Sequence, residues 1–74
     1  MDMKQKFGER MKQLRVSAGF SQEELSFKCD LDRTYINHVE RGKRNLSLSS
    51  IEKICKGLNV SLTEFFNDER FNSI

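Results

Sequence analysis

Four polar side chains lie within one short segment of the chain: Arg33, Thr34, Asn37 and His38. The planar guanidinium of Arg33 matches O6 and N7 of guanine, a contact worth about 1–3 kcal/mol of discrimination against a wrong base. Thr34 suits a thymine methyl or a phosphate, and the other two suit base edges or water. Arg33 also fits a solvated arginine beside an acidic cap, and His38 fits either interpretation.

A second set of side chains has the chemistry of phosphate contacts, which orient a protein on a nucleic acid without reading its sequence. Gln22 lies at a helix start, where donors and the helix dipole favour an anion. The other members are Tyr35, Arg41, Lys43, Asn45 and Ser50. The net charge of the 74 residues is only +2. Binding to a polyanion must therefore depend on where the charge lies, and the basic side chains concentrate before residue 45.

Helices must position these side chains, and caps and apolar spacing predict about five of them. The first covers about 4–17, with Phe7, Met11 and Leu14 on one face, and stops at Gly19. The fold class that follows is all-α.

Two short helices joined by a tight turn follow, over about residues 21–41. Ser21 and Glu24 form a capping box that begins the first of them. Asp30 suits the left-handed backbone of the turn, and Asp32 caps the second helix.

Two further helices complete the chain. We expect Ser47 to cap a helix whose apolar stripe lies at the centre of the core: Leu48, Ile51, Ile54, Cys55 and Leu58. Ser61 and Glu64 repeat the capping box and begin a helix of about 61–70. Its apolar side chains exceed what so small a core can bury, so we expect a dimer interface of Phe65, Phe66, Phe71 and Ile74.

Several function classes are disfavoured by what the sequence lacks. A chain of 74 residues forms one domain, 1–74, and shows neither a signal peptide nor a membrane span, so we expect a cytoplasmic protein. Cys29 and Cys55 lack metal-site spacing, and the single histidine has no ligand partners. Residues 42–43 lack the remainder of a phosphate-binding P-loop. We therefore expect no catalysis, metal, cofactor or small-molecule ligand.

Segments 21–25 (SQEEL), 31–36 (LDRTYI) and 40–42 (ERG) resemble the helix-turn-helix of the phage-repressor-like (Xre) family. Together with 44–46 (RNL), they resemble the controller proteins of restriction-modification systems. The resemblance implies a five-helix lambda-repressor-like domain that binds a palindromic DNA operator as a dimer. It would activate transcription at low occupancy and repress it at high occupancy, with RNA polymerase as a further partner.

The resemblance also implies roles for single residues. Arg44 would reach into a groove and touch a base. Arg15 and Glu40 would form a structural ion pair between the first helix and the recognition helix, although a DNA contact is the alternative for each. Ser26 and Asp30 stand where the family usually has Ala and often Gly, at the helix-turn-helix turn.

A protein-interaction module, such as an antitoxin, is the alternative function for this fold. Such a module would be expected to carry an extra C-terminal segment for its partner. Only a short tail follows Phe66, which favours the DNA-binding regulator.

Overall fold

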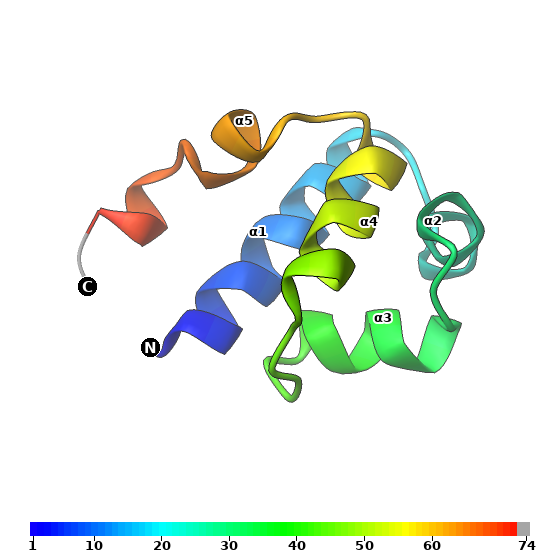
Figure 1. Ribbon diagram of the computed structural model, residues 1–74, viewed down its shortest axis with the longest axis horizontal. Coiled ribbons are helices and arrows are strands. Elements are labelled where there is room, and N and C mark those ends of the chain that lie inside the picture. The colour runs from blue at the N-terminus through cyan, green and yellow to red at the C-terminus, as the bar shows by residue number, and fades with distance from the viewer. Residues whose placement is uncertain (73–74) are drawn as a thin grey trace.

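The computed structural model describes residues 1–72, and over that range the chain is helical, with no β-strand (Figure 1). The helices are α1 (Met3–Ser17), α2 (Gln22–Cys29), α3 (Arg33–Glu40), α4 (Leu48–Leu58) and α5 (Leu62–Phe66), followed by a 3₁₀ turn η1 (Glu69–Phe71). The all-α, five-helix prediction is confirmed. No helix within the described range is long and apolar enough to cross a membrane.

The predicted capping boxes are present at α2 and α5. At α2 the backbone N–H of Glu24 donates to Ser21 Oγ over 3.0 Å, and the Ser21 N–H donates to the Glu24 carboxylate over 2.8 Å. Ser61 and Glu64 repeat this exchange at α5. The hydrogen bonds from Ser21 and Ser61 lower the pKa of the Glu24 and Glu64 carboxyls. A third box, at Asp2, was not predicted and begins α1 at Met3.

The turn between α2 and α3 has the predicted left-handed residue. Asp30 has φ 54° and ψ 45°, and the N–H of Leu31 returns to the carbonyl of Ser26 over 3.0 Å. The buried Ser26 hydroxyl donates to the carbonyl of Glu23 over 2.6 Å, so the side chain that replaces alanine has a partner. The turn accommodates both departures from the family pattern.

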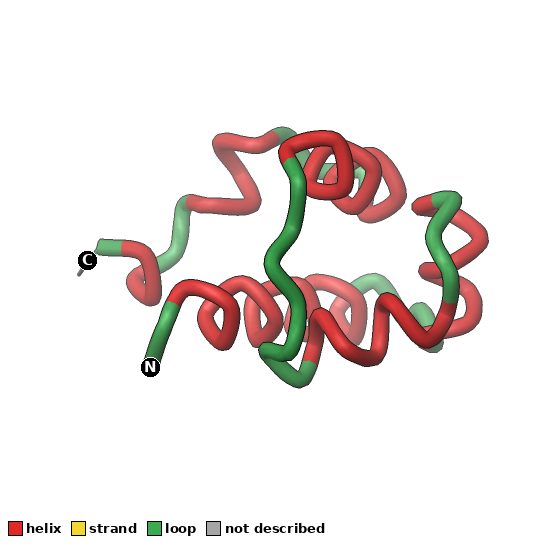
Figure 2. The backbone as a smooth tube through the Cα atoms, turned by 60° about the horizontal axis from the view of Figure 1, so that its bottom comes forward, coloured by secondary structure: helices red, strands yellow, loops and turns green. Residues whose placement is uncertain are grey.

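Two helix crossings depend on the absence of a side chain. A Cβ at Gly8 in α1 would overlap the carbonyl oxygen of Val39 and lie 3.0 Å from that of Glu40, both in α3. A Cβ at Gly57 in α4 would overlap the Cys29 sulfur and lie 3.0 Å from the Cys29 backbone nitrogen in α2. At the first crossing the α1 backbone touches the α3 backbone, and at the second the α4 backbone touches Cys29 of α2. Neither crossing has room for a methyl group. Figures 1 and 2 show α3 and α5 on opposite sides of the molecule.

The core differs from the expected set at one end of α4. Ile54, Cys55 and Leu58 are buried as expected, and Ile51 is half-buried. Leu48, the first residue of α4, is 85% exposed. The expectation that Leu48 belongs to the core is wrong.

The final helix is shorter than the expected 61–70. It ends at Phe66, and a separate turn, η1, begins after Asp68, whose carboxylate accepts from the Arg70 N–H over 2.9 Å. Asp68 has an extended backbone (φ −153°), which a continuous helix does not allow. This break lets η1 fold back beside α1 (Figure 2).

Candidate nucleic-acid interface

The N-terminal turn of α3 presents its side chains to solvent. Asp32 caps the helix by accepting from the Thr34 N–H over 2.7 Å, and Arg33 and Thr34 are exposed. The ion-pair contact of Arg33 is to Glu23 at 3.9 Å, with both side chains about two-thirds exposed at 66% and 64%. So long a contact between solvated groups holds the guanidinium only weakly. Arg33 can therefore turn toward another acceptor at little cost.

Asn37 and His38 lie one turn further along α3 and are half-buried. The Asn37 amide donates to Gln22 Oε1 over 3.4 Å. His38 borders a groove with Thr34, Tyr35 and Arg44. The structure brings the four base-reading candidates of α3 together on one surface, with Arg33 and Thr34 exposed and Asn37 and His38 half-buried.

A buried ion pair joins α1 to the end of α3. Arg15 donates to both carboxylate oxygens of Glu40, from Nε over 2.6 Å and from Nη2 over 3.0 Å, and from Nη1 to the carbonyl of Phe20 over 2.8 Å. Their side chains are 12% and 4% exposed. The predicted pairing of Arg15 with Glu40 is present, and its burial leaves neither group available to DNA.

Gln22 continues this network rather than standing free. Its Nε2 donates to Glu40 Oε1 over 3.1 Å, and its Oε1 accepts from Asn37. The phosphate contact of Gln22 stays a prediction, and in the structure its side-chain amide joins the start of α2 to Glu40 and Asn37 of the recognition helix α3. The side chain at the start of α2 therefore helps to fix the position of Asn37.

The segment that follows α3 carries several of the side chains predicted to contact DNA. Arg41, Lys43, Arg44 and Asn45 are exposed there. The guanidinium of Arg44 lies 4.5 Å from the centre of the Tyr35 ring, a cation–π contact across the end of the helix. The sequence carried no signal for this pair, because the residues are nine positions apart and on different elements. Ser50 is half-buried within the α4 cap, where its N–H and hydroxyl contact Ser47.

The two cysteines lie away from this surface and are chemically quiet. Both are free and buried, and burial raises the pKa of Cys29 to about 11, with Cys55 adding to the shift. Burial raises the pKa of Cys55 as well. A protonated thiol is a poor nucleophile and a poor metal ligand. Within residues 1–72, no three His, Cys, Asp or Glu side chains gather as a metal ion would require.

One member of the expected dimer interface needs correction. Phe65 is completely buried within its own chain, where its ring lies 4.5 Å from that of Phe7, so it offers no surface to a second copy. Phe66 and Phe71 are half-buried with ring centres 4.9 Å apart, and Ile74 lies outside the described residues. The sequence identified the excess of aromatic side chains but not that they pack on one another.

A different apolar surface lies at the start of α4. Leu48 and Leu62 are 85% and 53% exposed, and with the half-buried Ile51 they line one groove between α4 and α5. We call Leu48, Ile51 and Leu62 the α4–α5 apolar patch. It lies on helices other than the recognition helix.

Comparison with known proteins gives consistent matches. The profile of the helix-turn-helix family HTH_3 matches residues 11–65. Control protein C.MunI of Mycoplasma sp is 47% identical over 68 residues, which cover 90% of this chain and 92% of that protein. Control protein C.BamHI of Bacillus amyloliquefaciens is 56% identical over 55 residues, covering 73% of this chain and 68% of that protein.

Solved structures agree with the sequence matches. The restriction-modification controller protein C.Esp1396I superposes with a TM-score of 0.84 at 44% identity, over 89% of this chain and 85% of that one. C.AhdI of Aeromonas hydrophila superposes with a TM-score of 0.82 at 46% identity, over 85% of this chain and 96% of that one. C.Esp1396I has also been crystallised as a tetramer on its natural 35 base-pair operator.

Proposed function

Since this chain belongs to the helix-turn-helix family HTH_3 and, within it, to the restriction-modification controller proteins, we propose that it regulates transcription by binding an operator in double-stranded DNA. Proteins of this kind are regulators and not enzymes. The observation that carries the proposal is the exposed N-terminal turn of α3, with Arg33 and Thr34 projecting and cations at the opposite end of the helix. The cytoplasm, where bacterial DNA lies, is the expected place of action.

The division of labour follows from the geometry. In a helix-turn-helix the second helix enters the major groove and its first residues reach base edges. Arg33 and Thr34 hold that place on α3, and Arg33 is our choice for reading a guanine. Asn37 and His38 are second choices for base contacts because both are half-buried, and Arg44 is one because its guanidinium lies against the Tyr35 ring. Phosphate contacts fall to exposed side chains around α3, among them Lys43 and Asn45.

The test is selection of bound duplexes from a random pool, followed by salt titration. We expect Arg33→Ala to lose preference at one base pair per half-site and about 1–3 kcal/mol of binding free energy on the preferred sequence. Lys43→Ala is the matched control, because loss of a phosphate contact weakens all sequences alike and reduces the salt slope by about one. Equal weakening on every sequence by Arg33→Ala would assign Arg33 to phosphate instead.

We propose further that the chain acts as a homodimer joined through the α4–α5 apolar patch. Leu48 and Leu62 line one groove and expose apolar side chains to solvent. A second copy that covered the groove would remove this apolar surface from water. The patch lies outside α3, so a dimer would leave both recognition helices open. Two such helices must lie about 34–36 Å apart to enter successive major grooves of a palindromic operator.

Sedimentation equilibrium tests the dimer. We expect Leu48→Ser and Leu62→Ser each to shift the protein toward monomer while the thermal midpoint stays close to wild type, since both side chains are exposed in the monomer. Phe27→Ser is the matched control, because Phe27 is 80% exposed but lies on α2, away from the patch. A wild-type protein that stays monomeric with and without operator would refute the dimer.

Occupancy of the operator by one dimer or by two is the regulatory step in this proposal. The tetramer of C.Esp1396I on its operator supports two dimers as the fully occupied state. RNA polymerase is the further partner, activated beside one bound dimer and excluded by two. In vitro transcription across a protein titration should rise and then fall. If transcription only rose or only fell across the titration, the protein would be an activator alone or a repressor alone, and the two-step proposal would be wrong.

A further inference from the structure

Helix α5 is too short to persist without support from the rest of the chain. It has five residues, and isolated helices below about 12–15 residues are marginal in water. Its first turn is closed by the Ser61 capping box. In its last turn the Asn67 N–H donates to the carbonyl of Glu64 over 3.3 Å and the Asp68 N–H donates to that of Phe66 over 3.0 Å, while the carbonyl of Phe65 accepts from a more distant donor.

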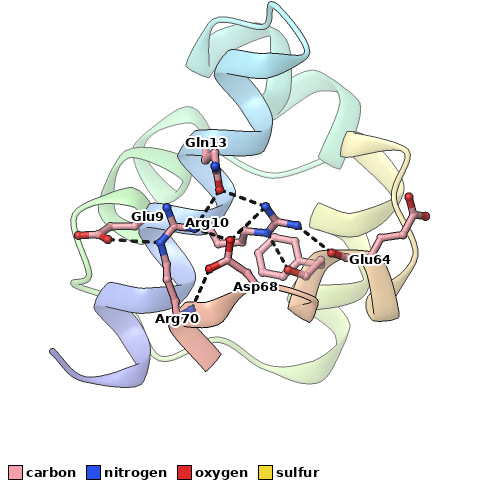
Figure 3. A network of polar contacts seen from close by, with 7 residues as sticks. Glu9, Arg10, Gln13, Glu64, Asp68 and Arg70 are labelled. Carbon is pink, nitrogen blue, oxygen red and sulfur yellow. Dashed lines mark hydrogen bonds and ion pairs between the residues drawn. The ribbon is translucent and has the colours of Figure 1, made fainter. Parts of the chain in front are cut away.

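Arg10 of α1 is the donor to Phe65 and a second donor to Glu64. Its Nε donates to the carbonyl of Phe65 over 2.8 Å, and its Nη2 donates to the carbonyl of Glu64 over 2.9 Å (Figure 3). One guanidinium from a helix distant in sequence thus bonds to two successive carbonyl groups. The planar fork of arginine suits this task, since it presents several N–H donors in a fixed geometry.

A second layer of polar side chains fixes the guanidinium in turn. Gln13 Oε1 accepts from Arg10 Nη1 over 3.0 Å and from Arg70 Nη1 over 2.9 Å. The Asp68 carboxylate lies between the same two arginines, 3.5 Å from Arg10 and 3.1 Å from Arg70. Arg70 also lies 3.6 Å from Glu9. Figure 3 shows these side chains converging from α1 and from the segment after α5. We call Arg10, Gln13, Asp68 and Arg70 the C-terminal clasp.

The position of α5 decides the shape of the α4–α5 apolar patch. Leu62, the first residue of α5, faces the groove that Leu48 and Ile51 line from α4. If the end of α5 were released, Leu62 would no longer lie at a defined distance from Leu48. The patch needs both elements, and only one of them is a long helix.

We propose that Arg10 is a positioning residue for dimerisation: its fork holds α5 by the carbonyl groups of Glu64 and Phe65, so that Leu62 completes the patch that meets the second copy. This inference rests on the proposed dimer. The recognition helix α3 lies on the opposite side of the molecule from α5 (Figure 1), so the bonds from Arg10 to α5 act on assembly and not on the reading of DNA.

The experiment measures dimerisation and half-site binding on the same variants. Arg10→Met keeps an unbranched side chain and removes every donor. We expect its dimer dissociation constant to rise about tenfold or more. Binding to a duplex with a single half-site, at protein concentrations where the chain is monomeric, should stay within about twofold of wild type. If Arg10 served only the stability of the fold, its loss would weaken both dimerisation and half-site binding, because α3 would lose its packing against α1 as well.

The matched control is Lys12→Met, which removes one positive charge from an exposed position on the same helix. It should leave both measurements unchanged. If Arg10→Met fails to fold, Arg10→Lys serves in its place, because one ammonium group keeps the charge but cannot reach both carbonyl groups and Gln13. We expect it to weaken the dimer as well, and wild-type dimerisation of a folded Arg10 variant would overturn the inference.

The two proposals fail in different ways. If Leu48→Ser and Leu62→Ser leave the dimer intact, the patch is not the interface and the proposed assembly is wrong. If they weaken the dimer but Arg10→Met does not, the assembly stands and only the positioning role is wrong.

Discussion

Helices α3 and α5 are both held by α1, but by different forces. The recognition helix α3 meets α1 where Gly8 lets the two backbones touch, and the buried pair of Arg15 with Glu40 closes the far end. Helix α5 is held by the partly exposed clasp around Arg10 and by one fully buried ring, Phe65. The α3 mounting combines a close backbone contact with a buried ion pair. The α5 mounting combines one buried ring with polar contacts that are more exposed, 28% at the Arg70 side chain.

This difference matches the tasks proposed for the two helices. Base reading needs side chains placed to within a fraction of an ångström, which close packing provides because interiors scarcely deform. Assembly through an apolar patch tolerates small shifts, since apolar attraction is non-directional. The four predictions below test the comparison, beginning with the largest expected effect.

Gly8→Ala should disrupt the packing of α1 against α3 most. The added methyl would overlap the Val39 carbonyl oxygen, so α1 and α3 must separate. We expect a loss of about 3 kcal/mol of unfolding free energy, with a Tm lower by roughly 12–24 °C. Gly19→Ala is the control: no atom lies within 4 Å of its Cβ, and the positive φ of 80° alone should cost about 1–2 kcal/mol. Similar losses in thermal melts would show that the crossing is not tight.

Glu40→Gln should weaken the attachment of α3 to α1 by removing the charge of the buried ion pair. Removing the carboxylate leaves the Arg15 guanidinium buried without its counter-ion, which should cost about 2–3 kcal/mol of unfolding free energy in urea titrations. Glu23→Gln removes a carboxylate whose partner is 3.9 Å away and exposed, and should cost less than about 0.5 kcal/mol. An unchanged midpoint for Glu40→Gln would make the pair incidental.

Native-state hydrogen exchange should separate the two regions directly. The Phe65 amide of α5 bonds back to Ser61, and the Asn67 amide at its end bonds back to Glu64. Both lie in a short segment, whereas the amides of α3 belong to a helix with buried Ile36 and Val39. We expect the α5 amides to exchange on the order of tenfold faster than the α3 amides under native conditions. Equal protection would mean that both helices open only with the whole molecule.

Acid should produce the smallest effect, through the two capping boxes. Glu24 and Glu64 have pKa values lowered from 4.5 by hydrogen bonds from Ser21 and Ser61, so near that pH the folded chain binds fewer protons than the unfolded chain. Their stabilisation is therefore complete above about pH 4.5 and is lost as the pH falls through the lowered values. Glu24→Gln and Glu64→Gln keep an acceptor without titrating, so urea titrations should show a shallower decline of stability with acid. An unchanged slope would contradict the pKa direction.

Much of the fold was predictable because helix ends are chosen locally. Ser21, Asp32 and Ser61 satisfy backbone groups two or three residues away, so the sequence alone shows where these helices begin. The left-handed turn at Asp30 is equally local. Arg33 could be identified as the base-reading candidate because it follows a cap that aims the start of a helix outward.

Tertiary structure decided what distant segments do to one another. Leu48 is exposed and Phe65 buried because burial depends on what lies opposite, and apolar spacing does not record where a neighbouring helix ends. The Arg10 clasp joins residues more than fifty positions apart, and the Gly8 crossing joins α1 to α3. A sequence pattern reports interactions within one helical turn, whereas these contacts exist only once the chain has closed on itself.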